Sequence, residues 1–482
     1  MPTPSPHLSP PGTIFDEATA LLRLGGPIIA AQLAQISMGF VDTVMAGRLS
    51  AGDLAAVAVA NSIWCTILIF AWGILMSVSP TVAHSFGAGE THAIASPVRQ
   101  GLWLSLAVSV CAIAVVRTAA PVFHWLKVDP AIIPTAVGFL QAISWGFPAS
   151  CAFTVLRGFS EAVGKTRPVM VVSLIGLVAN IAGNTIFMYG RLGLPPLGAI
   201  GCGVASAITM WIMTASLVAW IMVDRHYRPY ALFSQGERPH GTRIARLLKL
   251  GSPIGVCLLM EGSMFATVSL LMGSLGQDIV AGHQIAVNVA SVTFMVPLGL
   301  SVAITVRVGH AMGRRQPRHA RRSGLVGAGL AAAFMSLTAL VMAAFPRLIA
   351  SIYTADEGVR STAASLLVMA AIFQIFDGLQ VAGAAALRGL KDTAIPMLIT
   401  LVAYWGLGLP LGYMLGMTQG RGPQALWIGL IAGLAAAALL LNARFWLVTR
   451  RLSQEKRLAI PNPHDGVGTI AAERIVPTQS GL

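Results

Sequence analysis

Long apolar stretches alternate with short polar segments along almost the whole of the 482-residue chain. A stretch of 18 or more predominantly apolar residues is long enough to cross a bilayer as a helix. Twelve such stretches occur, at about 21–46, 54–83, 100–120, 131–156, 168–189, 196–223, 250–273, 279–306, 323–346, 361–387, 393–417 and 424–446. Several exceed the ~20 residues that a span needs, which predicts tilted or extended helices. The pattern therefore predicts an all-α polytopic membrane protein with twelve transmembrane helices.

The composition supports a membrane protein. Hydrophobic residues make up 55% of the chain and charged residues only 10%, whereas about a quarter of a soluble domain is charged. So few charges cannot cover the surface of a globule of this length. The net charge of +14 could suggest a nucleic-acid partner, so the position of the basic residues has to be considered.

The basic residues concentrate on one side of the predicted membrane. An even number of spans places both termini on the same side, and the loops at 225–249 and 307–322 on that side are strongly basic. The loops on the opposite side carry only Arg48, Arg117, Lys127, Arg191, Arg347, Arg360 and Arg421. Because positively charged loops are retained in the cytoplasm, we expect both termini to be cytoplasmic. The net charge then reflects the orientation of the chain in the membrane, and we predict no binding to nucleic acid.

The two halves of the chain resemble each other. The stretch GGPIIAAQLAQISMGF of span one aligns with GSPIGVCLLMEGSMFA of span seven at an offset of 226 residues, which pairs Pro27 with Pro253 and continues without a gap to Gly87 and Gly313. The tripeptide LRG also recurs in both halves. Each half contains six spans, so both run in the same direction and form a parallel repeat. We predict two six-helix lobes with a cleft between them, an architecture that favours a transporter.

The repeat divides the chain into five segments. We expect a disordered cytoplasmic N-terminal tail at 1–20, a first six-helix lobe at 21–224, a basic cytoplasmic linker at 225–249, a second lobe at 250–450 and a cytoplasmic C-terminal tail at 451–482. The tails are polar or rich in proline, which is typical of disorder. The paired prolines lie inside predicted helices, where each is expected to produce a kink, either static or a moving hinge.

Three acidic residues, Asp42, Glu261 and Asp377, fall inside predicted spans. A charge at bilayer depth costs several kcal/mol, so an intramembrane acid is by default a functional residue. At 1.5 Å per residue, Glu261 and Asp377 lie ~16–18 Å from the basic residues near their span ends, close to mid-bilayer. Asp42 lies about 7–8 Å from the end of its span. For Asp42 the alternative is therefore an acid that reaches the headgroups.

Other polar residues follow helical spacing within the spans. Residues that share one helix face are Gln32, Gln35, Gly39 and Asp42; Asn180 and Asn184; Gln284, Asn288 and Ser291; and Phe373, Asp377 and Gln380. Such faces avoid lipid, although a single amide can serve only to join two helices. Together they predict a polar pocket in each lobe. Gln35 and Glu261 are repeat partners, and no basic residue is evident at mid-span, so the cleft should favour cations.

These features together resemble the multidrug and toxic compound extrusion (MATE) transporters, in particular the NorM-type bacterial branch. The resemblance rests on GFVDTVMAG in span one, the first-half proline, LRG followed by GKTRP, LLMEGSMF in span seven and FQIFDGLQ in span ten. It covers about residues 15–450. It implies a secondary active antiporter, not an enzyme, that exports amphipathic, mostly cationic compounds by alternating access in exchange for inward Na⁺ or H⁺, with no cofactor. It also implies a location in the bacterial inner membrane. We expect the protein to function as a monomer there, in contact with membrane lipids.

The resemblance further implies which residues bind the coupling ion. Glu261 and Asp377 would form the cation site of the C-terminal lobe, where Na⁺ is one candidate, and the N-terminal site would combine Asp42 with the side chains of Asn180, Asn184 and Ser206. Gln35, Gln284, Asn288, Phe373 and Gln380 are our candidates for residues of the substrate cleft. Some relatives carry a tyrosine where this chain has Phe373, so a hydroxyl is missing here while an aromatic face remains for a cation.

Three other functions remain as alternatives. A lipid-linked precursor flippase of the same superfamily would need basic groups in the cleft for a pyrophosphate headgroup. An intramembrane enzyme would need a signature such as HExxH or GxSxG, and neither occurs in the chain. A receptor or structural membrane protein would not need embedded acids in a two-lobe repeat.

Overall fold

The computed structural model describes residues 13–458, apart from 126–127, 192, 194 and 235. Within these residues eleven helices are long and apolar enough to cross a membrane, and twelve spans result when two helices bent by 45° to each other count as one. The predicted all-α architecture of twelve spans is confirmed. The bent pair, at Ile133–Ser144 and Phe147–Ala162, is the fourth span.

The first lobe is built from the helices that precede the linker. They are α1 (Ile14–Gly47), α2 (Ala51–Leu75), α3 (Val78–Gly87), α4 (Ala95–Arg117), the short α5 (Ala120–Trp125), α6 (Ile133–Ser144), α7 (Phe147–Ala162), α8 (Arg167–Phe187) and α9 (Gly198–Val223). Two short turns of helix, η2 (Thr91–Ala93) and η3 (Arg228–Tyr230), lie in the connections.

The second lobe follows the linker. Its elements are α10 (Gly241–Leu275), α11 (Gln277–Gly313), α12 (Pro317–Ala344), α13 (Pro346–Tyr353), α14 (Glu357–Gly389), α15 (Ala394–Leu401), η4 (Val402–Gly408), α16 (Leu409–Tyr413), η5 (Met414–Thr418) and α17 (Pro423–Leu458). The segments η4 and η5 have π-helical geometry. The eleventh span is thus an interrupted helix, and such interruptions are frequent at functional sites.

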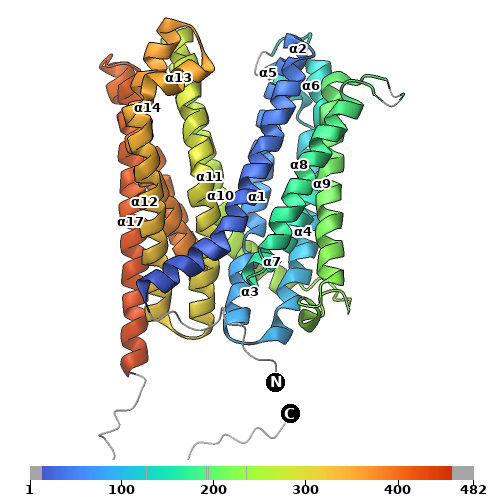
Figure 1. Ribbon diagram of the computed structural model, residues 1–482, viewed down its shortest axis with the longest axis vertical. Coiled ribbons are helices and arrows are strands. Elements are labelled where there is room, and N and C mark those ends of the chain that lie inside the picture. The colour runs from blue at the N-terminus through green and yellow to red at the C-terminus, as the bar shows by residue number, and fades with distance from the viewer. Residues whose placement is uncertain (1–12, 126–127, 192, 194, 235, 459–482) are drawn as a thin grey trace, which may run out of the picture.

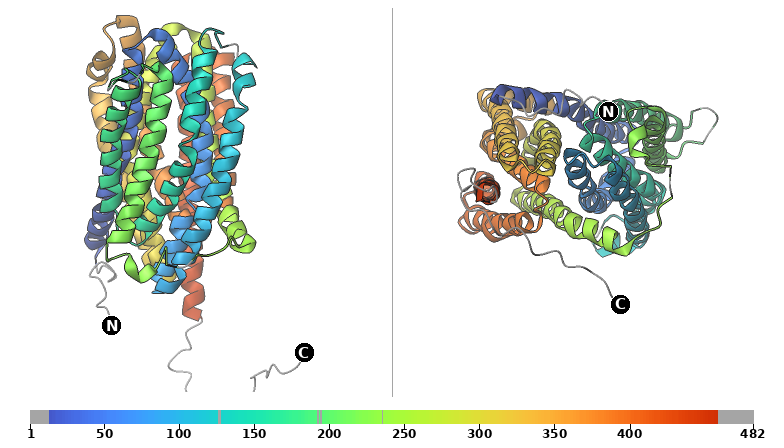
Figure 2. Two further views of the ribbon diagram at one scale, coloured as in Figure 1. Left: turned by 90° about the vertical axis from the view of Figure 1, so that its right-hand side faces the viewer. Right: turned by 90° about the horizontal axis from the view of Figure 1, so that it is seen from below.

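The two lobes meet at one end of the molecule and diverge toward the other (Figure 1). We call the end that carries the first turn of α1 and the last turns of α17 the terminal end, and the opposite end the distal end. Seen from the terminal end, the helices form two bundles (Figure 2). The lobes contact each other through α1 against α11, α2 against α10, and α3 against α11.

Helix α1 begins earlier than the apolar pattern predicted. Thr13 caps it, because the Thr13 hydroxyl accepts from the Asp16 amide at 3.1 Å and the Asp16 carboxylate accepts from the Thr13 amide at 2.9 Å. Residues 14–20 of the expected tail are therefore helical, and this part of α1 packs against α11 and α12 of the other lobe. Pro27 lies inside α1, which changes direction part-way along its length (Figure 1).

Two further boundaries differ from the expected segments. Helix α10 begins at Gly241, so the last part of the expected linker at 225–249 is already helical. Helix α17 continues to Leu458, past the expected end of the second lobe at 450. The rest of both expected tails, 1–12 and 459–482, lies outside the described residues.

Candidate functional site

The first cluster of polar residues lies inside the N-terminal lobe, around Asp42 on α1. Its carboxylate accepts hydrogen bonds from the side-chain amides of Asn180 at 3.0 Å and Asn184 at 2.6 Å, both on α8. The Ser206 hydroxyl on α9 donates to its other oxygen at 3.1 Å. The two asparagines are one helical turn apart and so share a face of α8. The structure thus brings together the four residues that the sequence analysis assigned to this lobe.

This cluster can bind a cation through oxygen atoms. Asn180, Asn184 and Ser206 are buried, and the side-chain oxygen of Asn184 is a buried acceptor without a hydrogen-bond partner in the described part of the chain. An asparagine amide has an NH₂ group that donates and an oxygen that accepts. Turning either amide over would therefore direct its oxygen toward a cation bound at the Asp42 carboxylate. A carboxylate, amide oxygens and a hydroxyl are the ligands that hard cations prefer.

Gln35 lies in a separate network. Its amide donates to the Ser173 hydroxyl at 3.3 Å, and its oxygen accepts from Arg157 at 3.3 Å. Arg157 also forms a salt bridge of 2.7 Å with Glu161, one turn further along α7. Both residues lie in the last two turns of α7, which ends at Ala162, so Glu161 stands at a span end and Arg157 close to it. The sequence analysis did not single out this pair, and the four-residue spacing of Arg157 and Glu161 was the signal that could have found it.

The second cluster lies inside the C-terminal lobe, around Glu261 on α10 and Asp377 on α14. The charges of the two carboxyl groups interact with each other, and Arg388, near the end of α14, interacts with Glu261. Asp377 is buried. In the described residues no group of three or more His, Cys, Asp or Glu side chains could hold a metal ion. Any cation here would therefore need oxygen atoms from other residue types.

Two other side chains near these acids have such oxygen atoms. Tyr404 is fully buried, and its hydroxyl has no hydrogen-bond partner among the described residues, nor has the side-chain oxygen of Gln380. The phenol of Tyr404 lies within electrostatic range of Glu261 and Asp377. Tyr404 belongs to the π-helical segment η4. Sequence reasoning missed it because it belongs to no polar stripe and is far from both acids in the chain.

Phe373 and Gln380 do not face an open cleft in this structure. Phe373 is 2% exposed and Gln380 is 5% exposed. The ring of Phe373 packs edge-on against Phe265 and Trp427, with centroids 5.7 Å apart in both cases. This packing places Phe373 in the core of the lobe, so its aromatic face is not available to a cation in this conformation.

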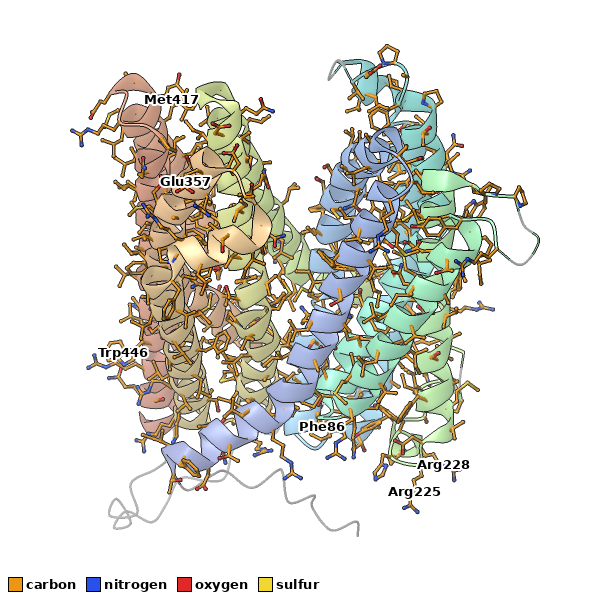
Figure 3. The ribbon with its side chains drawn as sticks, turned by 45° about the horizontal axis from the view of Figure 1, so that its top comes forward. Phe86, Arg225, Arg228, Glu357, Met417 and Trp446 are labelled. Atoms are coloured by element: carbon orange, nitrogen blue, oxygen red, sulfur yellow. The ribbon has the colours of Figure 1, made fainter. Side chains whose placement is uncertain are left out.

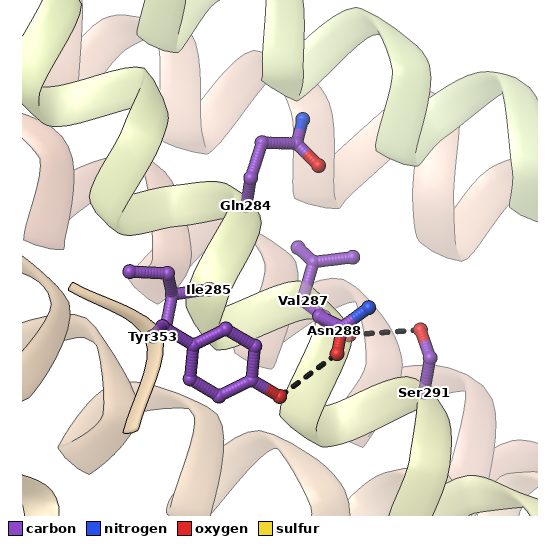
Figure 4. Close-up of a pocket in the computed structure, with 6 residues that line it drawn as sticks. All are labelled: Gln284, Ile285, Val287, Asn288, Ser291 and Tyr353. Atoms are coloured by element: carbon purple, nitrogen blue, oxygen red, sulfur yellow. Dashed lines mark hydrogen bonds between the residues drawn. The ribbon is translucent and has the colours of Figure 1, made fainter. Parts of the chain in front are cut away.

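Gln284 and Asn288 line an open recess between α11 and α13 (Figure 4). The recess has a volume of about 320 Å³ and is also lined by Ser291 and Tyr353. The Tyr353 hydroxyl donates to the side-chain oxygen of Asn288 at 2.9 Å. The recess offers neutral hydrogen-bonding groups and no charge of its own. These two cleft candidates therefore line a recess to which neither Glu261 nor Asp377 contributes.

Comparison with known proteins shows similarity over nearly the whole chain. A family model described as MatE matches residues 27–186 and 253–414. The chain is 42% identical over 464 residues to multidrug resistance protein PmpM of Pseudomonas aeruginosa, a match that covers 95% of this chain and 97% of that protein. It is 40% identical over 436 residues to multidrug resistance protein NorM of Photobacterium profundum, which covers 89% of this chain and 96% of that protein.

Solved structures share the fold at much lower identity. A MATE transporter crystallised in a bent conformation matches with a TM-score of 0.85 and 18% identity, over 94% of this chain and 100% of that one. The outward-facing conformation of a multidrug resistance MATE transporter matches with a TM-score of 0.83 and 18% identity, over 91% and 97% of the two chains.

Proposed function

This chain belongs to the MatE family, and on that premise we propose that it is a secondary active antiporter that exports amphipathic, mostly cationic drugs in exchange for inward Na⁺ or H⁺. The observation that carries the proposal is the cluster in which Asn180, Asn184 and Ser206 all bond to Asp42. Two relatives, at 42% and 40% identity, are named multidrug resistance proteins. The proposed location is the bacterial inner membrane, with both termini in the cytoplasm.

The geometry around Asp42 suggests how ion binding is linked to shape. The carboxylate joins α1 to α8 and α9 through three hydrogen bonds. Protonation would add a donor to this group and remove its charge, and a bound Na⁺ would compete with the three donors for the same oxygens. Either event changes the free energy of the arrangement in which α1 lies against α8 and α9. An ion that binds one arrangement more tightly shifts the population toward it.

The alternative of a lipid-linked precursor flippase receives little support from the basic residues inside the lobes. Arg157 is bonded to Glu161 and Gln35, and Arg388 interacts with Glu261. A pyrophosphate group would have to displace acidic neighbours to reach either guanidinium. We therefore keep drug export as the proposed function.

The decisive test of function is uphill transport in liposomes that contain only the purified protein. An imposed inward Na⁺ gradient and an imposed inward H⁺ gradient, each applied alone, should reveal which ion drives efflux of a fluorescent cationic drug such as ethidium. At least one gradient should move the drug against its concentration difference. If neither gradient does so while passive exchange also fails, drug antiport is the wrong function for this chain.

The orientation of the chain gives a separate prediction. Arg225 and Arg228 of the basic linker lie at the terminal end, and Glu357 lies near the distal end (Figure 3). We expect the terminal end to be cytoplasmic, because moving the linker charges outward against the membrane potential is unfavourable. In a variant without native cysteines, a membrane-impermeant thiol reagent added to intact cells should label Thr354→Cys and miss Arg238→Cys. Strong labelling at position 238 would reverse the orientation.

A further inference from the structure

Two histidines outside the candidate ion sites occupy equivalent positions in the two halves of the chain. His84 lies near the end of α3 and His310 near the end of α11, and the 226-residue offset of the internal repeat aligns them. Both lie at the terminal end, where the lobes meet. Neither the polar stripes nor the embedded acids account for them.

Each histidine bonds to the opposite lobe. The Nε2 atom of His84 lies 2.7 Å from the carbonyl oxygen of Gly389, the last residue of α14. The Nε2 atom of His310 lies 2.6 Å from the carbonyl oxygen of Ala162, the last residue of α7. A carbonyl only accepts, so each Nε2 carries the proton and donates. The last carbonyls of a helix need partners outside it, and here the other lobe supplies them.

At two glycines beside the histidines, Gly87 and Gly313, the backbones of the two lobes approach too closely to leave room for a side chain. A Cβ atom on Gly87 would lie 2.3 Å from the carbonyl oxygen of His310, and one on Gly313 would lie 2.1 Å from that of His84. These glycines are also repeat partners. The contact is therefore reciprocal: each lobe presents a glycine to the backbone of the other lobe's histidine. The ring of Phe86 adds a contact with His310, at 4.9 Å between centroids, in the region where the lobes meet (Figure 3).

A buried ion pair adds to the contact between the lobes at the terminal end. Glu17, in the first turn of α1, is fully buried and accepts from Arg307 of α11 at 2.6 and 2.9 Å. The Ser323 hydroxyl of α12 also donates to it at 2.7 Å. Arg307 lies one turn before His310 on α11. The start of the first span is thus joined to the second lobe beside the histidine contact.

We propose that His84 and His310 form a two-part latch that holds the lobes together at the terminal end and opens in every transport cycle. Donor and acceptor of each bond belong to different lobes, so separation of the lobes at this end breaks both bonds together. The latch rests on the proposed function, because a transport cycle is what would separate the lobes at this end. Its effect on lobe separation can be measured without any transport.

The test measures the distance between the lobes at the terminal end. Spin labels at His92→Cys and Arg318→Cys, both exposed residues of this end on opposite lobes, report the separation by pulsed electron resonance in a background without native cysteines. His84→Ala and His310→Ala should each raise the population with separated lobes about three- to tenfold, as expected for the loss of one buried hydrogen bond. His310→Gln should stay within about twofold of the parent, because its side-chain amide can donate to the same carbonyl.

Glycine variants give an independent arm if the histidine variants accumulate poorly. Gly313→Ala should separate the lobes, because its methyl group would overlap the His84 carbonyl, whereas Gly329→Ala, with open space at its Cβ, should not. His240→Ala, an exposed histidine of the same end, is the control for the loss of an imidazole. If His84→Ala and His310→Ala keep the parent distance distribution, or if His310→Gln behaves like His310→Ala, the latch is wrong. A shift in distance without drug transport by the parent would instead overturn the proposed function alone.

Discussion

Replacing Asp42 with asparagine should leave drug binding within about threefold of the parent but lower gradient-driven uphill efflux at least about tenfold, within the usual range of coupling energies. The asparagine keeps the size of the side chain and can still bond to Asn180, Asn184 and Ser206. It cannot be protonated at this position, and it brings no negative charge to a cation. The purified variant in liposomes, given a bound fluorescent drug and then an inward Na⁺ or H⁺ gradient, provides the measurement.

A matched acid separates this effect from a general loss of charge. Asp278, at the start of α11, is exposed, and Asp278→Asn should transport normally. If Asp42→Asn pumps uphill at the parent rate, Asp42 serves only to pack α1 against α8 and α9. The role in coupling would then fall to Glu261 and Asp377.

The second large effect is expected in the C-terminal lobe. Glu261→Gln and Asp377→Asn should each reduce drug resistance of cells at least about tenfold, while the amount of protein in the membrane stays unchanged. Each substitution removes one ionisable carboxyl group of an interacting pair inside the lobe and keeps most of its shape. The measurement is the inhibitory drug concentration, with the membrane amount followed by immunoblot. Full resistance in both variants contradicts an ion site at these residues.

Two further variants define this site more closely. Glu357→Gln, on the same helix as Asp377 but with an exposed side chain, should behave as the parent. Tyr404→Phe removes a buried hydroxyl that has no hydrogen-bond partner among the described residues, so the folded protein should lose little stability. If the coupling ion is Na⁺ held by this oxygen, the variant should need a higher Na⁺ concentration for half-maximal efflux.

Much of the architecture was readable from the sequence because membrane insertion depends on local composition. Apolar stretches long enough to span a bilayer set the number of helices, and the 226-residue repeat set their division into two lobes. The three embedded acids stood out because a charge in lipid is costly wherever the chain folds. The asparagines at positions 180 and 184 were visible because helical spacing puts residues four apart on one face.

The sequence by itself thus determined which segments cross the membrane and which residues are too polar for lipid. The tertiary structure decided which polar residues meet. The sequence analysis left Glu17 in the N-terminal tail, because its partner Arg307 is 290 residues away and nothing in the nearby sequence reveals the contact. Tyr404 comes near Glu261 and Asp377, and His84 reaches the end of α14, only through the packing of helices distant in sequence. Such contacts leave no periodic pattern along the chain, because they depend on how whole helices and lobes are placed against each other.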